Sequence, residues 1–393
     1  MAKPAAILDI GSSKIVCLVG SAVNADGISV HGVSVCPYSG YRAGEFESPQ
    51  ALREAVIEAV QQAEQDSRTR IREVALAVPP PFTRLVTTEA RIGIHSRSGK
   101  ITAQDIDDLI TESLKKARAK DYVLMHSTPV SFTVNGVVSG EVPEGVKADE
   151  ISGVVSHMYV REPFVKAMEE TLESINVEIS MCVSSQLAEA LAIIPEKERV
   201  RPAVLLDVGY THTDVAVVEN AALTHSATID VGGMHFASDL SFGLDIPLDV
   251  AEQVKRRYVF GQDALSSTEI IRMAAGTKRV EHSVIELIME ARANELVGLI
   301  RRTLSKLGVG AEASPTTYLT GGGIAMVKGG SEFMRLALNL PVKRDIPFMP
   351  EMNSPNFTSA FGAMDFVLRA LGGYYDDEPS GGVVDRLRDL FTK

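Results

Sequence analysis

Two segments of this chain, residues 9–19 and 207–217, repeat one pattern, and this repeat constrains the fold more than any other feature. Each segment has an aspartate at the end of an apolar strand-like run, a glycine two residues later, and a second apolar run after a short turn. Backbone N–H groups in such a turn can point at phosphate oxygens, and glycine lets the ligand come close. A single Asp-x-Gly turn is commonplace, but one in each half of the chain predicts two phosphate-binding turns.

The aspartates of these turns, Asp9 and Asp207, are candidate magnesium-binding residues. Magnesium prefers oxygen ligands and keeps much of its water, so a carboxylate at a strand end can hold it, usually through water. A third glycine site, Gly321-Gly322-Gly323, follows an apolar run, and we expect a helix from there through Val327. Such a loop can pass beneath a nucleotide, although an ordinary strand-to-helix turn has the same sequence. The Walker A and dinucleotide-binding glycine spacings are absent.

Composition is that of an ordinary globular chain: 393 residues, 45% hydrophobic and 23% charged, long enough for about two to three domains. The net charge of -12 argues against nucleic-acid binding, which needs a basic surface, so we expect no nucleic-acid partner. The three cysteines lie singly in apolar runs, which predicts buried free thiols in a reducing compartment. Without a signal sequence or a run of about 18–20 apolar residues, we expect a cytosolic chain.

Strand and helix patterns alternate along the chain. The expected strands are residues 5–10, 15–20, 71–78, 85–94, 122–138 and 151–160. The expected helices are one opened by Ser48 and Pro49 and those at 101–119, 162–175 and 283–306, the last within a helix-rich region at 240–310. Thr102 and Asp105 have the spacing of a capping box. Residues 84–160 differ in texture from their surroundings and have the pattern of a small α+β insertion.

The end of the chain is amphipathic and follows a polar break. Residues 376–382 are acidic, proline- and glycine-containing, which is typical of a flexible linker. On a helix over 382–393 the large apolar side chains fall within an arc of about 120°, with the charged ones opposite. These apolar residues are Val383, Val384, Leu387, Leu390 and Phe391. A helix docked on its own domain would have the same pattern, but the preceding linker favours a membrane or partner surface.

Longer motifs agree with the two turns. Asp9-Ile-Gly-Ser-Ser-Lys14 is followed along the chain by the motif-like stretches 230–244, 251–258 and 355–362. Their order and spacing, together with the insertion, resemble the FtsA family of the actin/Hsp70/sugar-kinase ATPase superfamily. This resemblance implies an α/β, two-lobed actin-like (ribonuclease H-like) fold with an inserted small α+β subdomain and a C-terminal amphipathic helix.

The resemblance also implies a domain organisation. The expected units are subdomain 1A (1–83 and 161–201), subdomain 1C (84–160), subdomain 2A (202–240 and 311–371), subdomain 2B (241–310), a flexible linker (372–382) and a membrane-targeting helix (383–393).

Residue roles follow from the same resemblance. The implied nucleotide-binding residues are Asp9, Gly11, Ser12, Ser13, Lys14, Asp207, Gly209, Thr211, Asp214, Glu252, Lys255, Gly321, Gly322 and Gly323. The two turns would contact the phosphates of ATP, the strand-end aspartates would hold Mg²⁺ through water, and the three glycines would lie under the adenosine. Glu252 would bond the ribose and Lys255 would flank the base. These two also stand at i, i+3 on a helix, so a simple ion pair is equally open.

The second turn departs from the family pattern, which has small residues where this chain has Tyr210 and His212. Tyr210 cannot take a positive φ as cheaply as glycine, so it must turn away or crowd the phosphates. His212 could bond a phosphate or titrate near neutral pH, but we expect a plain surface histidine. Gln186 or Glu189 could orient the attacking water. We therefore expect ATP binding with weak or no hydrolysis.

The resemblance further implies a location and partners. The chain would polymerise at the cytoplasmic face of the bacterial membrane, at the division site, and would recruit later division proteins through the inserted subdomain. It would bind the C-terminal tail of FtsZ through Arg292, Arg301 and Arg302, although an intrahelical pair with Glu295 is the alternative for Arg292. One tail helix should bind membrane lipids weakly, and several on a polymer far better.

Two other functions remain open. A small-molecule kinase of the same superfamily should have a catalytic aspartate in a sugar pocket of the first half, for which the sequence offers no convincing candidate. Another actin-like adaptor, such as the PilM type of pilus assembly, would not need the amphipathic tail.

Overall fold

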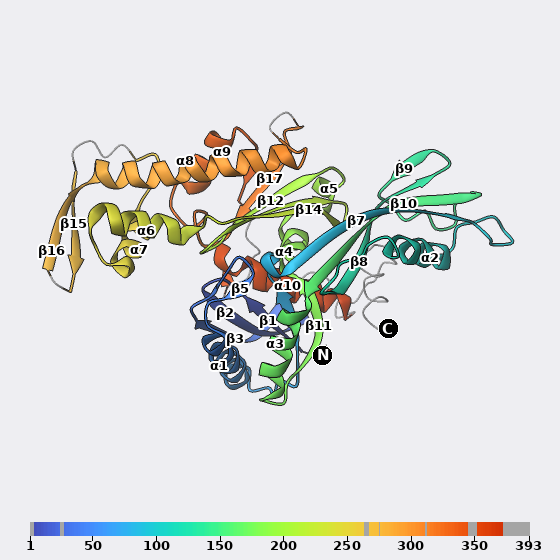
Figure 1. Ribbon diagram of the computed structural model, residues 1–393, viewed down its shortest axis with the longest axis horizontal. Helices are drawn as coiled ribbons and strands as arrows, with labels where there is room; N and C mark the ends of the chain where they lie inside the picture. Colours follow the sequence, from blue (N-terminus) through green and yellow to red (C-terminus); the bar gives the residue numbers. More distant parts are fainter. Residues whose placement is uncertain are drawn as a thin grey trace.

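The computed structural model describes residues 4–371, apart from 24–26, 263–266, 275, 311–312 and 345–351. Figure 1 shows two lobes, each built on a sheet, with a third and smaller sheet to one side. The predicted linker at 372–382 and the tail helix at 383–393, with its five apolar residues, lie outside the described residues. Among the helices that are described, none has both the length and the apolar character that crossing a membrane requires.

The first lobe is a five-stranded sheet in the order β11-β6-β1-β2-β3. Its strands are β1 (Ala5–Ile10), β2 (Lys14–Val23), β3 (Gly27–Pro37), β6 (Glu73–Val78) and β11 (Glu178–Ser184). The first three form an antiparallel meander, and β6 and β11 run parallel to β1. α1 (Pro49–Ser67) and α3 (Glu162–Glu173) cover one face, where Leu8 shares a core with Val56 and Phe164. The predicted N-cap is confirmed, since Ser48 Oγ accepts a hydrogen bond from Ala51 N at 3.1 Å.

The second lobe repeats this topology in the order β14-β13-β12-β17-β18. Its strands are β12 (Ala203–Val208), β13 (Thr213–Glu219), β14 (Ala222–Ile229), β17 (Thr317–Thr320) and β18 (Val342–Lys343). Again three strands form an antiparallel meander and two run parallel to the first of them. The apolar runs on either side of each Asp-x-Gly turn are the first two strands of a meander. The repeated sequence pattern therefore marks a repeated structure.

Two helices, α4 (Ser185–Ile193) and α10 (Thr358–Ala370), pack between the sheets. One core cluster joins Ile7 of the first sheet, Leu205 of the second, and Leu187 and Met364 of these helices. The helices cross in backbone contact, because a Cβ at Gly362 would lie 2.7 Å from Glu189 Cα. Only glycine permits this crossing without displacing a helix.

Residues 83–161 form a separate four-stranded sheet in the order β7-β10-β8-β9. Its elements are β7 (Thr83–Gly93), α2 (Ala103–Leu114), β8 (Tyr122–Val134), β9 (Val137–Ser139) and β10 (Glu150–Arg161). α2 has the predicted capping box of Thr102 and Asp105, but it ends at Leu114 and not at 119. Its Leu109 packs with Phe132 and other side chains in a core of its own. The domain boundaries inferred from the sequence remain predictions.

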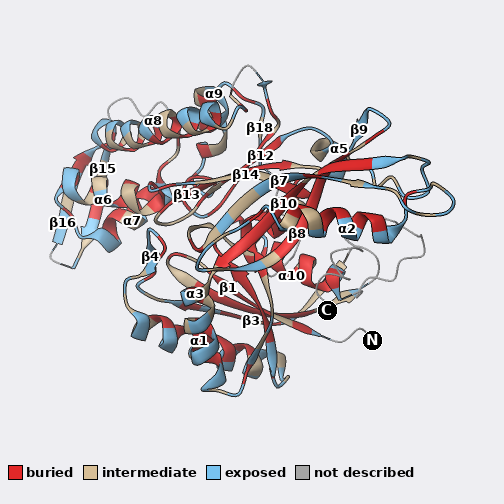
Figure 2. Cartoon of the chain, turned by 45° about the vertical axis from the view of Figure 1, so that its right-hand side comes forward, coloured by how far each residue is buried: buried red, intermediate tan, exposed pale blue. Residues whose placement is uncertain are grey.

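The helix-rich region contains α6 (Gly233–Leu244), α7 (Leu248–Arg257) and α8 (His282–Lys306), and α9 (Gly330–Leu338) follows later. It also holds a hairpin that the sequence analysis missed, β15 (Thr268–Met273) with β16 (Gly276–Glu281). Short elements complete the fold: β4 (Tyr41–Arg42), β5 (Glu45–Phe46), α5 (Glu196–Arg199), and the 3-10 turns Pro80–Phe82 and Pro355–Phe357. Figure 2 shows the buried residues concentrated in the sheets, with the outer faces of α1 and α8 exposed. The three cysteines are free thiols.

Candidate nucleotide-binding site

The two Asp-x-Gly turns have the same local geometry. In the first turn Gly11 N donates to Lys14 O at 3.0 Å, and in the second Gly209 N donates to His212 O at 2.9 Å. Each bond closes a tight turn between the first two strands of its meander. Each turn thereby keeps its intervening residues at the end of its sheet, where further backbone N–H groups are available to a ligand.

The fold brings these turns into contact. Thr211 N of the second turn donates to Ser12 Oγ of the first at 3.3 Å. Tyr38 holds the first turn through two hydrogen bonds. Its hydroxyl donates to Gly11 O at 2.8 Å, and its backbone N–H donates to Ser13 O at 3.2 Å. Residues from opposite halves of the chain therefore meet at one place in the fold.

Both strand-end aspartates are buried, and both hold their protons more tightly than usual. Burial raises the pKa of Asp9 to about 6. A hydrogen bond from Ser359 Oγ to Asp9 Oδ1 at 2.9 Å lowers the pKa and so partly opposes this shift. Burial, and then the nearby Asp214, raise the pKa of Asp207 to about 7. Asp207 Oδ1 has no hydrogen-bond partner among the described residues. A divalent cation would relieve this crowding of carboxylates, so the donor set fits magnesium.

Lys14 is a buried positive group near the two aspartates. Its Nζ is buried without a hydrogen-bond partner among the described residues and lies 4.0 Å from the centre of the Phe357 ring. Burial lowers the pKa of this amine to about 8, although Asp9 partly opposes the shift. A buried amine over an aromatic ring is satisfied best by an anion placed beside it. Lys14 and the two aspartates together fit the phosphates and magnesium of a nucleotide.

The glycine loop packs directly against the second turn. Gly321 has a φ of 90°, and a Cβ there would lie 2.1 Å from Asp207 Oδ1. Gly323 N donates to Val208 O at 2.7 Å, and Gly233 N donates to Gly209 O at 2.8 Å. These contacts leave no room for side chains between the loop and the turn. Gly321 and Gly323 therefore lie against the second turn, whereas Gly322 faces Asn356 and Met326.

The helix predicted immediately after this loop was wrong. Residues 321–329 form turns, and α9 begins only at Gly330. The reason lies in the backbone, because Gly321 and Gly329 have φ values of 90° and 73°, outside the helical region.

Lys255 and Glu252 of α7 form the ion pair that the sequence left open. Lys255 Nζ lies 2.7 Å from Glu252 Oε2 and donates to Gly233 O at 3.1 Å. Burial lowers the pKa of Lys255, against the raising effect of Glu252. The pair thus ties α7 to the start of α6, beside the glycine loop. Contacts of either residue with a ribose or base remain predictions.

Known proteins resemble this chain along nearly its whole length. A family model described as cell division protein FtsA matches residues 204–362. Cell division protein FtsA of Neisseria meningitidis serogroup B is 26% identical over 97% of this chain and 96% of the relative. That of Pseudomonas aeruginosa is 23% identical over 97% and 95%. The chain is similar to cell division protein FtsA along nearly its whole length.

Solved structures that resemble this chain establish its fold. A PilM-PilN type IV pilus biogenesis complex matches with a TM-score of 0.63 at 18% identity, over 96% of this chain and all of the other. MreB5 of Spiroplasma citri bound to AMPPNP matches with a TM-score of 0.56 at 14% identity, over 93% and 96%. At such identities the likeness concerns the fold alone, and that fold is actin-like with two lobes, as predicted.

The second turn contains a buried histidine. His212 is 8% exposed, with its ring 5.5 Å from that of Tyr41, so the expectation of a plain surface histidine was wrong. Its burial depends on Tyr41, which belongs to the other lobe. Its Nε2 lies 3.1 Å from Asp214 Oδ2, which commits that predicted ligand residue to an internal contact. Tyr210 is not among the described residues with positive φ, so it fits the turn without backbone strain.

The two candidate hydrolysis residues lie buried on α4. Gln186 Oε1 accepts a hydrogen bond from Ser226 Oγ at 2.7 Å, whereas its Nε2 has no partner among the described residues. Burial, together with Asp207, Asp9 and Asp214, raises the pKa of Glu189 well above its usual range. A raised pKa makes Glu189 a poorer acceptor for a proton from water, and its part in hydrolysis remains a prediction.

The three arginines on α8 have different surroundings. Arg292 Nη2 donates to Asp239 Oδ1 at 2.8 Å, and the predicted pair with Glu295 is also present. Arg301 donates to a backbone carbonyl of α9, and Arg302 is exposed. Binding of a partner by these three arginines remains a prediction.

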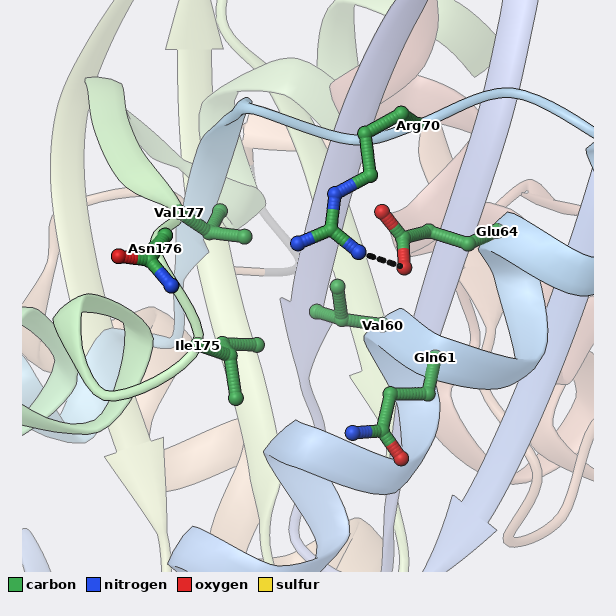
Figure 3. Close-up of a pocket in the computed structure, with 7 residues that line it drawn as sticks. All are labelled: Val60, Gln61, Glu64, Arg70, Ile175, Asn176 and Val177. Carbon is green, nitrogen blue, oxygen red and sulfur yellow. Dashed lines mark hydrogen bonds and ion pairs between the residues drawn. The ribbon is translucent and has the colours of Figure 1, made fainter.

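A cavity of about 230 Å³ lies elsewhere, between α1 and the connection from α3 to β11 (Figure 3). Glu64 and Arg70, two of its lining residues, already form an ion pair at 3.2 Å. Neither phosphate turn contributes a residue to it, so it is separate from the candidate site.

Proposed function

We propose that this protein is an actin-like, ATP-binding component of cell division that links division filaments to the membrane. The observation that carries the ATP site is the contact of the two turns, with Lys14 Nζ and Asp207 Oδ1 buried and unpartnered among the described residues. A triphosphate and its metal supply the opposite charge to both atoms. The similarity to cell division protein FtsA supports the role in cell division.

Each group at the site would have one task. Asp9 and Asp207 would hold magnesium through water, and the bound metal would neutralise phosphate charge. Lys14 and the turn N–H groups would hold the phosphates in place. Gln186, with its free Nε2, would be the residue best placed to orient a water molecule, while protonated Glu189 would keep hydrolysis slow.

Membrane attachment would come from the apolar stripe at 383–393. A helix of this length is marginal alone in water, so it would fold on the lipid surface. Burial of its five apolar side chains could contribute several kcal/mol before the cost of ordering the peptide. Polymerisation would place many such helices on one membrane and raise their joint affinity. The FtsZ tail and later division proteins would be the partners.

Lipid co-sedimentation tests the proposal. The full chain and a chain ending at Asp377 are mixed with anionic liposomes, with and without Mg-ATP. We expect the full chain to pellet, more so with ATP, and the shortened chain to stay in solution. Leu390→Glu on the apolar face should act like the truncation, and Thr392→Glu on the polar face serves as its charge-matched control. Equal pelleting of the full and shortened chains would remove the tail from the proposal.

A further inference from the structure

A chain of side-chain contacts runs through the second turn. Asp214 Oδ2 lies 3.1 Å from His212 Nε2, and His212 Nδ1 lies 2.9 Å from Thr211 Oγ1. Asp214 is held in turn, since Thr228 Oγ1 donates to its Oδ1 at 2.6 Å. Asp214 and His212 are buried, whereas Thr211 is only half-buried, in the turn that faces Ser12. The relay therefore begins inside the sheet and ends at the ligand side of the turn.

The first lobe covers this relay. The Tyr41 ring of the β4–β5 hairpin packs 5.5 Å from the His212 ring, and Tyr41 is itself buried. Hydrogen bonds are stronger in such a low-dielectric setting, and their partners are fixed more firmly. The charged groups that act on the imidazole are all acidic: Asp214 of β13, Asp207 of β12, and Asp230 after β14.

The relay determines what the Thr211 hydroxyl can offer a ligand. Burial opposes protonation of His212, but Asp214, helped by Asp207 and Asp230, outweighs it, so the pKa of the imidazole lies above its usual value. When protonated, the ring donates from Nε2 to Asp214 and from Nδ1 to Thr211 Oγ1. The Thr211 hydroxyl is then free to donate its own proton outward. Phosphate oxygens are acceptors, so this is the orientation they require.

We propose that the buried Asp214–His212 pair is a positioning device that turns the Thr211 hydroxyl into a hydrogen-bond donor for the phosphates of bound ATP. This inference rests on the proposed ATP site. His212 touches no ligand in this scheme and acts only through Thr211. The departure from small residues in the second turn thus gains a specific role.

The test is a double-mutant cycle on the affinity for Mg-AMPPNP, measured by calorimetry with the full chain. His212→Leu should weaken binding about tenfold, in keeping with the loss of one charge-assisted hydrogen bond. In a Thr211→Val background the same change should cost less than about twofold, because the hydroxyl it controls is gone. His212→Asn should retain most of the affinity, because its amide can donate to Thr211 from the position of Nδ1.

A matched control lies in the same sheet. His225 Nδ1 lies 3.2 Å from Thr224 Oγ1 on β14, and His225 is exposed, so His225→Leu removes a similar pair outside the site and should leave affinity unchanged. If His212→Leu fails to fold, Thr211→Val and His212→Asn still test the inference. A Thr211→Val protein that binds Mg-AMPPNP as tightly as the wild type would overturn it. Additive losses in the cycle would also overturn it. Failure of the wild-type chain itself to bind AMPPNP would instead refute the ATP site on which the inference rests.

Discussion

Binding of ATP should be coupled to protonation of Lys14. The pKa of its buried amine is about 8, against an ordinary value of 10.5. If bound phosphates restore the ordinary value, the protein takes up a proton on binding whenever the pH exceeds about 8. Asp9 and Asp207, with pKa values of about 6 and 7, are already ionised there. Between pH 8 and 9.5 the linkage weakens binding about fifteenfold, which corresponds to about 1.6 kcal/mol.

Calorimetric titration with Mg-AMPPNP at several pH values measures this slope, and buffers of different ionisation enthalpy report the proton directly. Lys14→Arg should bind with little slope, because a guanidinium stays charged throughout this range. Lys14→Met should bind weakly at every pH. A wild-type slope that persists in Lys14→Arg, or binding with no proton uptake at pH 9, would refute the assignment of Lys14 to the phosphates.

Three further outcomes follow from buried groups. Gly321→Ala should lower the free energy of unfolding in urea by roughly 1–3 kcal/mol and abolish nucleotide binding. Gly308→Ala is the control, because Gly308 has a φ of 73° but an added Cβ would have no atom within 4 Å. It should lower the free energy of unfolding by only about 1 kcal/mol. Burial lowers the pKa of His157 to about 4, so this residue should contribute about 2 kcal/mol of destabilisation on acidification from pH 7.5 to 5, because the unfolded chain binds the extra proton. His157→Gln should reduce the pH dependence by that amount, while the similarly buried His126 retains its own contribution. Glu189→Gln should leave stability at pH 7 within about 0.5 kcal/mol, and a larger loss would mean that the carboxyl is ionised in the fold.

The sequence predicted features that depend on local periodicity and on single backbone positions. The two turns were recoverable because an aspartate ends each apolar run and a glycine opens each turn. The β15–β16 hairpin was missed because its short strands, such as 276–281, carry charged residues and lack a clean alternation. The burial of His212 could not be foreseen, since Tyr41, which covers it, comes from the other lobe. The helix expected after Gly323 failed because flanking glycines take positive φ, which sequence pattern alone does not reveal.

The crossing of α4 and α10 at Gly362 is the point about which the two lobes would rotate relative to each other. Each helix shares a core with both sheets, and the turns themselves meet at the hydrogen bond from Thr211 N to Ser12 Oγ. The turns lie close to this crossing, because Ser359, three residues before Gly362, donates to Asp9 Oδ1 at 2.9 Å. A small change in the separation of the turns would therefore produce a larger displacement at the outer ends of the lobes. A ligand that changes the separation of the turns would thus change the angle between the lobes. A protein that binds both lobes would therefore bind differently according to the ligand in the site.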